Sequence, residues 1–457
     1  MFNRREIVGA GVALTVAAPA LAAKGPAKGK ADRFVCRAGT HFTIGGKPYH
    51  YAGANMWYGA WLGADAAYGD RARLRRELDA LAAMGVTNLR VLASAEDSPL
   101  LHAVAPAMHD KAGHYNQALL GGLDYLLAEM AKRNMRAALY LTNFWEWSGG
   151  MMTYLSYVNG GHYINNGDPA HPWPEFADEV AAFYHTPAAM ALFRKHVQVM
   201  VGRTNSVTKV AYANDPTIMA WQLGNEPRPA GSDKVGLPNL PAFHAWVQSS
   251  AKLIKTLAPH QLVCTGSEGL KGSLEREEIV KATHSIPEID YLTCHVWPLN
   301  WSWVDAANLA STEASGAAKI DDYVSAHIRI AGDLGKPLVI EEFGYPRDGG
   351  SYDVNATTAF KDRFYRQIYA AVEANVKIGG PVAGTNFWAW NGEGRPAHSD
   401  YRFVPGDTSW VGDPPHEPQG WYGVFDSDAS NKSIIREHAA TLAKIAAAGT
   451  MGAKATA

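Results

Sequence analysis

Two glutamates stand where short apolar segments of this 457-residue chain end. Residues 221–227 read WQLGNEP and residues 338–344 read LVIEEFG, so Glu226 and Glu342 each follow a segment typical of a buried strand. Each lies beside a Pro or Gly that constrains the backbone. Two carboxyl groups directed at one bond can act as a general acid/base and a nucleophile. The pattern predicts such a pair rather than two unrelated surface charges.

Two further polar residues end apolar segments of the same kind. Arg90 lies in 88–92 (NLRVL), where a guanidinium can hydrogen-bond a carboxylate and hold it ionised. His295 lies in 291–297 (YLTCHVW), and beside a carboxylate pair we interpret it as a site residue. The sequence contains no HExxH motif and no His pair at ligand spacing, so we predict neither a metal nor another cofactor.

Aromatic residues gather near the same strand ends. Sugar rings have apolar C–H faces that flat indole rings cover, while polar neighbours bind the hydroxyl groups. We therefore predict a carbohydrate-binding cleft, whereas Trp221, in the middle of its strand, is expected in the core. The clustered aromatic residues are Trp57, Tyr58, Trp61, Trp145, Trp147, Trp297, Trp301, Trp303, Trp388 and Trp390.

Eight apolar, β-branched segments alternate with helical patterns, which predicts an α/β fold, a (β/α)8 TIM barrel, rather than an open sheet. An open doubly wound sheet would place a Gly-rich phosphate turn after its first strand, and 53–57 (GANMW) is not one. The predicted strands are 49–55, 88–93, 136–143, 218–226, 261–268, 290–297, 337–344 and 384–390. The clearest predicted helices are 71–84, 119–133 and 359–375.

A barrel of this order explains how distant residues can meet. Strands four and seven face each other, and barrels keep their chemistry at the carboxyl ends of the strands. Glu226 and Glu342 would therefore converge, and a separation of about 5–5.5 Å is what a retaining glycoside hydrolase requires. Three long loops, 94–116, 146–175 and 391–421, would rise from the same face as lids or binding walls.

Composition and the chain ends set further limits. With 42 Lys+Arg against 44 Asp+Glu the charge is −2, which argues against nucleic-acid binding. Arg4, Arg5 and a short apolar run predict a twin-arginine-like export signal at 1–22, so we expect a periplasmic or secreted protein with no membrane span. The predicted organisation is completed by a leader at 23–33, one catalytic domain at 34–448 and a tail at 449–457. Cys264 and Cys294 are expected as buried free thiols.

The motifs at these strand ends resemble glycoside hydrolase family 5, and within it the β-mannanase branch. The resemblance spans about residues 34–440, and its ordered set of motifs is more specific than a lone Asn-Glu-Pro. The segments that carry it are 142–150 (TNFWEWSGG), 224–229 (GNEPRP), 341–347 (EEFGYPR) and 386–390 (NFWAW).

The resemblance implies roles for individual residues. Glu226 would be the acid/base, Glu342 the nucleophile, and Asn225 would bind the sugar 2-hydroxyl. Glu341, one residue earlier on the strand, should point to the opposite face. Arg90 and His295 would support the two carboxylates. Trp388 would lie under the sugar and Trp145 towards the non-reducing side, whereas Arg228 and Glu268 would lie on the leaving-group side. The further substrate-binding candidates are Asn143, Trp57 and Trp390.

One residue departs from the family pattern. Two positions after His295 the family usually has a Tyr whose hydroxyl bonds the nucleophile, and here Trp297 stands there. An indole N–H can donate a hydrogen bond but cannot accept one.

The predicted function is retaining, metal-independent hydrolysis of β-1,4-mannosidic bonds by an endo-β-1,4-mannanase, with a β-mannan polysaccharide or manno-oligosaccharide as substrate. An exo-acting β-mannosidase is the nearest alternative, if the loops 146–175 and 391–421 wall off one end of the cleft. A β-1,4-glucanase is a further alternative, because gluco and manno sugars differ only at C2. A non-catalytic carbohydrate-binding barrel is the alternative from another class.

Overall fold

The computed structural model describes residues 33–455. The predicted export signal at 1–22 and all but the last residue of the predicted leader at 23–33 lie outside the described residues.

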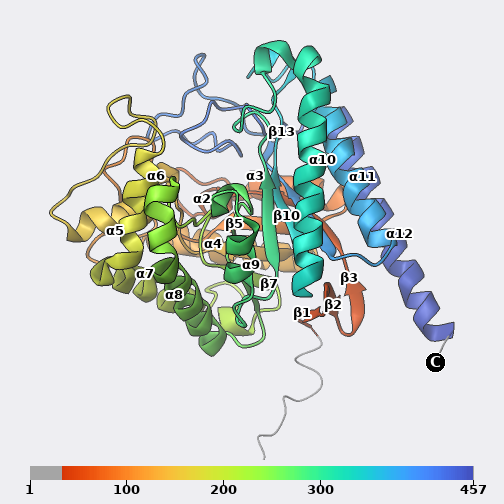
Figure 1. Ribbon diagram of the computed structural model, residues 1–457, viewed down its shortest axis with the longest axis horizontal. Helices are drawn as coiled ribbons and strands as arrows, with labels where there is room; N and C mark the ends of the chain where they lie inside the picture. Colours follow the sequence, from red (N-terminus) through yellow and green to blue (C-terminus); the bar gives the residue numbers. More distant parts are fainter. Residues whose placement is uncertain (1–32, 456–457) are drawn as a thin grey trace, which may run out of the picture.

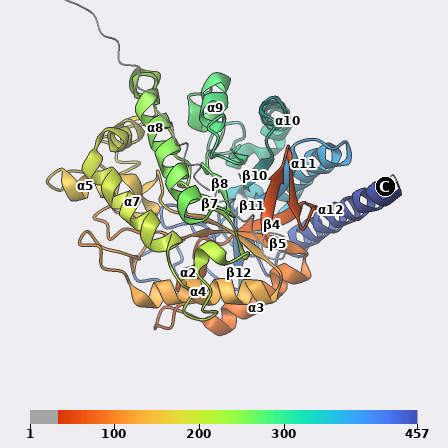
Figure 2. The same cartoon turned by 90° about the horizontal axis from the view of Figure 1, so that it is seen from below.

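Eight parallel strands form the sheet at the centre of the molecule, in the order β8-β7-β6-β5-β4-β11-β10-β9 (Figure 2). The two end strands meet, because the Asp290 N–H donates to the Val263 carbonyl at 2.8 Å and the His295 N–H to the Glu268 carbonyl at 3.1 Å. The sheet is thus a nearly closed barrel, as predicted. Its strands are β4 (Tyr51–Asn55), β5 (Val86–Leu92), β6 (Arg136–Tyr140), β7 (Ile218–Gln222), β8 (Leu262–Cys264), β9 (Leu292–Val296), β10 (Leu338–Phe343) and β11 (Val382–Phe387).

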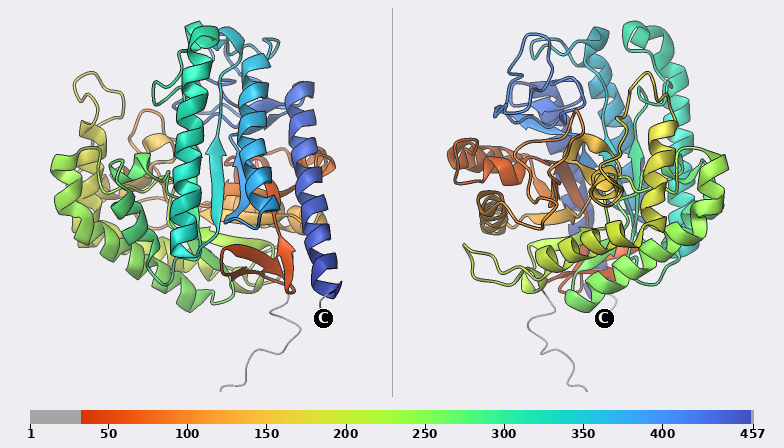
Figure 3. Two further views of the ribbon diagram at one scale, coloured as in Figure 1. Left: turned by 45° about the vertical axis from the view of Figure 1, so that its right-hand side comes forward. Right: turned by 90° about the vertical axis from the view of Figure 1, so that its left-hand side faces the viewer.

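Helices surround this barrel (Figures 2 and 3). In α3 the Asp70 side chain caps the first turn by accepting from the Arg73 N–H at 2.9 Å, and Leu74, Leu78 and Leu81 lie on the buried face. The α-helices are α2 (Gly59–Leu62), α3 (Arg71–Ala83), α4 (Gln117–Lys132), α5 (Gly150–Val158), α6 (Glu175–Val180), α7 (Pro187–Val201), α8 (Asp233–Leu257), α9 (Glu277–His284), α10 (Leu309–Leu334), α11 (Ala359–Lys377) and α12 (Ala429–Ala455). Short 3₁₀ turns are η1 (Glu146–Ser148), η2 (Ala181–His185), η3 (Tyr212–Asn214), η4 (Lys271–Ser273), η5 (Ala306–Asn308) and η6 (Asp348–Gly350).

A small antiparallel sheet, which the sequence analysis does not predict, lies at the amino ends of the barrel strands. It consists of β1 (Val35–Ala38), β2 (His41–Ile44) and β3 (Lys47–Tyr49), at the bottom of Figure 1. Phe42 packs edge-on against Tyr291 with ring centroids 5.3 Å apart. The small sheet therefore buries apolar side chains of the end of the barrel opposite the predicted site.

The irregular region 393–421 lies at the other end, at the top of Figure 1, between β12 (Trp390–Gly392) and β13 (Val424–Phe425). Arg73 of α3 donates to the carbonyls of Ser409 at 2.7 Å and Trp410 at 2.6 Å. Buried Asp413 accepts the backbone N–H groups of Gly420, Tyr422 and Gly423 at 2.7–3.0 Å. Hydrogen bonds to buried charged groups thus fix this long region on the barrel.

Other expectations concern the helices and cysteines. The last helix, α12, runs to Ala455 and so covers most of the predicted tail at 449–457. Among residues 33–455, no helix has the length and apolar character needed to cross a bilayer. Cys264 and Cys294 are buried free thiols, as predicted.

Candidate active site

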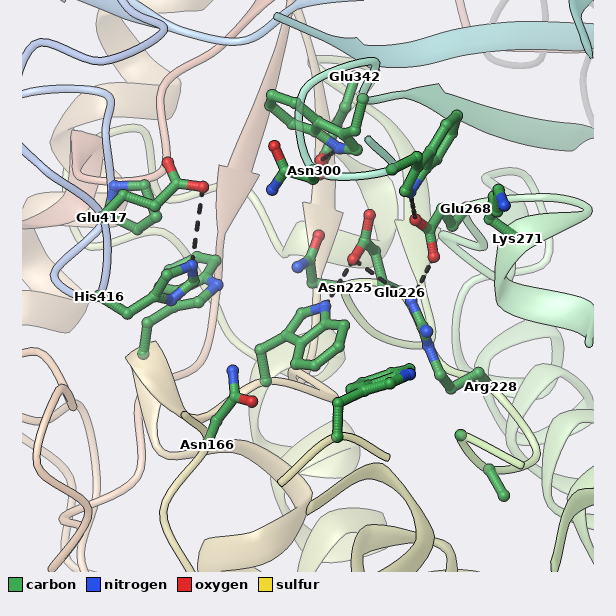
Figure 4. Close-up of a pocket in the computed structure, with 18 of the residues that line it drawn as sticks. Asn166, Asn225, Glu226, Arg228, Glu268, Lys271, Asn300, Glu342, His416 and Glu417 are labelled. Atoms are coloured by element: carbon green, nitrogen blue, oxygen red, sulfur yellow. Dashed lines mark hydrogen bonds and ion pairs between the residues drawn. The ribbon is translucent and has the colours of Figure 1, made fainter. Parts of the chain in front are cut away.

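Glu226 and Glu342 converge at the carboxyl ends of β7 and β10, in the cavity shown in Figure 4. One oxygen of each carboxylate and one ring nitrogen of His295 all lie within 4.8 Å of one another. Glu226 adopts a left-handed backbone conformation (φ 52°) just after the strand, a strained conformation of the kind that clusters at functional sites. Carboxylate oxygens this close can act on one bond as a nucleophile and an acid/base.

Arg90 lies beneath the two carboxylates and is fully buried. Its Nη1 donates to Glu342 Oε1, its Nη2 to Asn225 Oδ1 at 2.7 Å and its Nε to Gln222 Oε1 at 2.8 Å. The guanidinium also lies 4.5 Å from the Tyr140 ring centroid. Because all these contacts fix its position, Arg90 orients both Glu342 and Asn225 without facing the cavity itself.

His295 joins the two carboxylates. Its Nδ1 lies 2.6 Å from Glu226 Oε1 and 3.2 Å from Glu342 Oε2. Burial disfavours the imidazolium, but the charge of Glu342 and the contacts with Glu226, Glu341 and Glu342 outweigh it and hold the pKa of His295 well above its usual value. Burial likewise favours neutral Glu226, yet the hydrogen bond and charge of His295, with Arg228 nearby, lower the pKa of Glu226 to about 2. The pair therefore shares a proton that rests on His295 in the substrate-free site.

Glu341 does not point to the opposite face, so the expectation from strand alternation is wrong. The ladder between β10 and β9 shifts at this position: Ile340 pairs with Cys294 and Glu342 with His295, which leaves Glu341 as the extra residue of a β-bulge. Its buried carboxylate accepts from Gln222 Nε2 and lies 3.4 Å from Arg90 Nε. Both consecutive glutamates thus contact Arg90 inside the barrel.

Trp297 contacts the candidate nucleophile from β9. Its indole Nε1–H donates to Glu342 Oε2 at 3.2 Å, so the donor that the family places on a Tyr is here an indole. Gly344 lets the ring lie there, because a Cβ on Gly344 would come 2.6 Å from the Trp297 ring. The Trp297 indole also packs on Tyr422, with 4.9 Å between the two ring centroids.

Replacing Trp297 tests this donor. Trp297→Phe should lower kcat about ten- to hundredfold, because a hydrogen bond to a charged group is worth roughly 1.5–3 kcal/mol. Trp297→Tyr, which restores a donor, should recover part of the loss. Steady-state kinetics on an aryl glycoside substrate measure both variants, and an unchanged kcat in Trp297→Phe would show that the bond does not orient Glu342.

Asn225 and Asn143 form a hydrogen-bonded pair beside Glu226. Asn225 Nδ2 donates to Asn143 Oδ1 at 3.1 Å, and Asn143 Nδ2 donates to Ser148 Oγ at 3.2 Å. Asn225 lines the cavity, whereas Asn143 is buried behind it. Asn143, proposed from the sequence as a substrate contact, therefore positions Asn225 instead.

Arg228 and Glu268 form an ion pair on one side of Glu226 (Figure 4). Trp301 Nε1 donates to Glu268 Oε1 at 3.1 Å. Burial, then the charge of Glu226, raises the pKa of Glu268 to about 7 despite Arg228. Trp145 lies on this same side, because Arg228 stacks 4.8 Å from its ring centroid. The prediction that Trp145 and Arg228 lie on opposite sides is therefore wrong.

Trp145 also contacts the candidate acid/base directly. Its indole Nε1–H donates to Glu226 Oε2 at 2.5 Å. Trp173 extends the aromatic surface outward, with its ring centroid 6.2 Å from that of Trp145, and its side chain is 59 % exposed. The Arg228 side of the cavity thus opens to solvent.

The other side of the cavity is formed by residues that the sequence analysis does not assign to the site. His416 and Glu417 come from the region 393–421 and lie near Trp147 and Trp388 (Figure 4). Burial, then the charges of Asp413, Glu342 and Glu226, raises the pKa of Glu417 well above its usual range. In the sequence, the features that could have indicated these residues are the length of the loop 391–421 and the adjacent His416 and Glu417 within it.

Trp57 and Trp390 do not reach the cavity, so their prediction as substrate contacts is wrong. Trp57 packs among other indoles in the core, and its Nε1 donates to the Gly412 carbonyl at 2.9 Å. Trp390 is fully buried in β12. Trp221, predicted to be in the core, is fully buried. An aromatic residue near a strand end can face the core or the cleft, and spacing alone does not distinguish the two.

The cavity as a whole has a volume of about 630 Å³. Among residues 33–455, one group of acidic and His side chains is spaced closely enough to hold a metal ion: Glu226, Glu342 and His295. The atoms of this group that face one another already form hydrogen bonds, both within the group and with Trp145, Trp297 and Arg90. Its lining comprises Trp145, Trp147, Asn166, Trp173, Asn225, Glu226, Arg228, Ala230, Gly231, Asp233, Glu268, Lys271, Leu274, Glu275, Trp297, Asn300, Trp301, Glu342, Trp388, Pro414, His416 and Glu417.

Comparison with known proteins agrees with this geometry. A glycoside hydrolase family 5 mannosidase from Rhizomucor miehei superposes with a TM-score of 0.83 at 35% identity, over 92% of this chain and 99% of that one. A mutant of that mannosidase in complex with mannosyl-fructose superposes with a TM-score of 0.83 at 34% identity, over 91% of this chain and 99% of that one. A putative mannan endo-1,4-β-mannosidase 9 of Oryza sativa subsp. japonica is 28% identical over 96% of both chains. The family model "GH family 5 beta-mannosidase-like" matches residues 32–447, and the chain belongs to this family.

Proposed function

We propose that this protein is a retaining exo-β-mannosidase that removes mannose from the non-reducing end of β-1,4-linked manno-oligosaccharides. Family membership and the names of the relatives support a mannoside substrate. The separation of Glu226 and Glu342 supports retention. The endo action predicted from the sequence, which the name of the rice relative also carries, becomes the alternative.

The observation that carries exo action is the unequal burial of the two sides of the cavity. On the His416 side, Trp147, Trp388 and Glu417 are 1%, 3% and 9% exposed. On the Arg228 side, Trp173 is 59% exposed and the side chain of Glu275 is 66% exposed. A long polymer must pass out of the cleft at both ends, whereas a chain end needs only one opening. The wall of Trp147, His416 and Glu417 therefore favours binding of a terminal sugar.

The proposed reaction has two steps. Glu342 attacks the anomeric carbon, the bond from that carbon to the leaving oxygen breaks, and Glu226 gives the leaving oxygen a proton. The proton reaches Glu226 Oε1 from His295 Nδ1 across the 2.6 Å hydrogen bond. Water then attacks the glycosyl-enzyme while Glu226 takes its proton, and the ester bond to Glu342 breaks. Because Glu226 gave up its proton in the first step, it is a carboxylate and can act as the base in the second.

The product time course on mannohexaose tests this function. We expect mannose and mannopentaose as the first products, because the wall admits a single terminal sugar. Proton NMR of the initial product should show the β-anomer, as retention requires. The Glu342→Ala variant is the control for contaminating activity.

The other outcomes distinguish the alternatives. Early oligomers of two to four mannoses would establish an endo-mannanase. Cleavage of cellohexaose alone, measured in parallel, would identify a glucanase. Binding without cleavage of either substrate would identify a carbohydrate-binding barrel.

We also propose that residues 1–22 direct export to the periplasm or beyond, as the twin Arg and apolar run suggest. Sequencing the amino terminus of the protein purified from the host envelope or medium should then give residue 23 as the first residue. An uncleaved protein found only inside the cell would contradict export.

A further inference from the structure

Glu341 is a buried carboxylate that the two-step reaction does not use. Its Oε2 lies 3.9 Å from His295 Nε2, on the side of the imidazole opposite Glu226. Neither atom has a hydrogen-bond partner among the described residues. The imidazole thus lies between two carboxylates, with Nδ1 towards Glu226 and Nε2 towards Glu341.

The two oxygens of Glu341 have different surroundings, and Oε2 faces both Arg90 and His295. Oε1 accepts from Gln222 Nε2, and Arg90 Nε is 3.4 Å from Oε2. Arg90 also donates a hydrogen bond to Glu342, so one guanidinium contacts two carboxylates. A second cation nearby would balance the charge, and His295 is the group placed to supply it. The titratable groups facing Glu341 are Tyr51, Arg90, Tyr140, Cys264, Tyr291, Cys294 and His295, while His295 also faces Glu226, Glu268, His327 and Glu342.

We propose that Glu341 is a positioning residue that acts through His295: its charge keeps Nε2 protonated, so that the proton shared with Glu226 is the one on Nδ1. The proton then moves from Nδ1 to Glu226 Oε1 and on to the leaving oxygen, while Nε2–H stays facing Glu341. The β-bulge at Glu341 is what turns this second carboxylate inward. This inference rests on the proposed role of Glu226 as the acid.

The pH dependence of kcat/KM on an aryl β-mannoside with a poor leaving group tests the proposal. Its basic limb reports loss of the shared proton from the free enzyme. Removing a negative charge near His295 lowers the proton affinity of the His295–Glu226 pair. Glu341→Gln should therefore move the basic limb to lower pH by about 1 unit or more. Glu341→Asp, which keeps the charge, should leave the limb at the wild-type pH even if kcat falls.

Asp124→Asn provides the matched control. Asp124 is a buried carboxylate that accepts from Arg203 at 2.9 and 2.6 Å, on α4 and away from the cavity. Its replacement also removes a buried charge and should lower thermal stability, but should leave the basic limb in place. An unmoved limb in Glu341→Gln, or an equal movement in Glu341→Asp or Asp124→Asn, would overturn the proposal.

Neutron diffraction of the wild-type protein at pH 7 tests the same point without a variant or a substrate. We expect deuterium on His295 Nε2 and none on Glu341. A bare Nε2 or a deuterated Glu341 would overturn the inference even if mannoside hydrolysis is established. If the wild-type protein hydrolyses no mannoside, in contrast, the proposed function is wrong, and neutron diffraction still tests the proton positions on His295 and Glu341.

Discussion

Glu342→Ala should lower kcat on aryl β-mannosides by about 10⁴-fold or more, because the change removes the carboxylate assigned to form the glycosyl-enzyme. Azide should restore turnover of 2,4-dinitrophenyl β-mannoside by occupying the space that the carboxylate leaves. Azide would attack the anomeric carbon once, as the bond to dinitrophenolate breaks, so the product should be the α-mannosyl azide. Release of dinitrophenolate and NMR of the azide product measure the two effects.

Glu342→Gln is the matched control for this experiment. Its amide has nearly the shape of the carboxylate and can still accept from Arg90, so the cavity stays filled and azide should not rescue it. Thermal unfolding of both variants checks that the fold is kept. A β-mannosyl azide, or activity in Glu342→Ala within about a hundredfold of wild type, would show that another residue is the nucleophile.

Glu226→Gln should separate substrates by their leaving groups. Hydrolysis of mannobiose should fall by about 10²- to 10⁴-fold, because the leaving oxygen then receives no proton. The first step with 2,4-dinitrophenyl β-mannoside needs no acid and should change little. The second step does need Glu226 as a base, so a burst of dinitrophenolate followed by slow turnover is expected. Stopped-flow absorbance measures the burst.

Azide also distinguishes the role of Glu226 from that of Glu342. In Glu226→Gln the glycosyl-enzyme still forms, and azide would attack it to release Glu342, which gives the β-mannosyl azide after two displacements. An equal loss of rate on both substrates, with no burst, would contradict the assignment of Glu226 as the acid/base.

The catalytic pair was predictable because its signal is local. Glu226 and Glu342 each follow a short apolar strand, and β7 and β10 end within four residues of them. Each of the eight predicted strands overlaps one of the observed barrel strands. Parallel strands in a barrel bring their carboxyl ends to one rim, so the order of the elements suffices to place both glutamates there.

The orientation of neighbouring side chains depended on the tertiary structure. Strand alternation places Glu341 outside the barrel, but the bulge against β9 turns it inward, and a bulge is a property of two strands together. Trp57 and Trp145 have equally suggestive positions in the sequence. One is enclosed by other indoles, whereas the other meets Arg228 and Glu226.

The wall that favours exo action depends partly on the sequence pattern and partly on the tertiary structure. By itself the sequence determined a long irregular region after the eighth strand, which contains His416 and Glu417. Its path across the barrel mouth is fixed by Arg73, which lies more than 300 positions earlier and binds the carbonyls of Ser409 and Trp410. Strands form from the pattern of adjacent residues, and so the sequence determined the catalytic pair. The position of His416 and Glu417 beside the catalytic pair arises from contacts between distant segments, which only the packed tertiary structure decides.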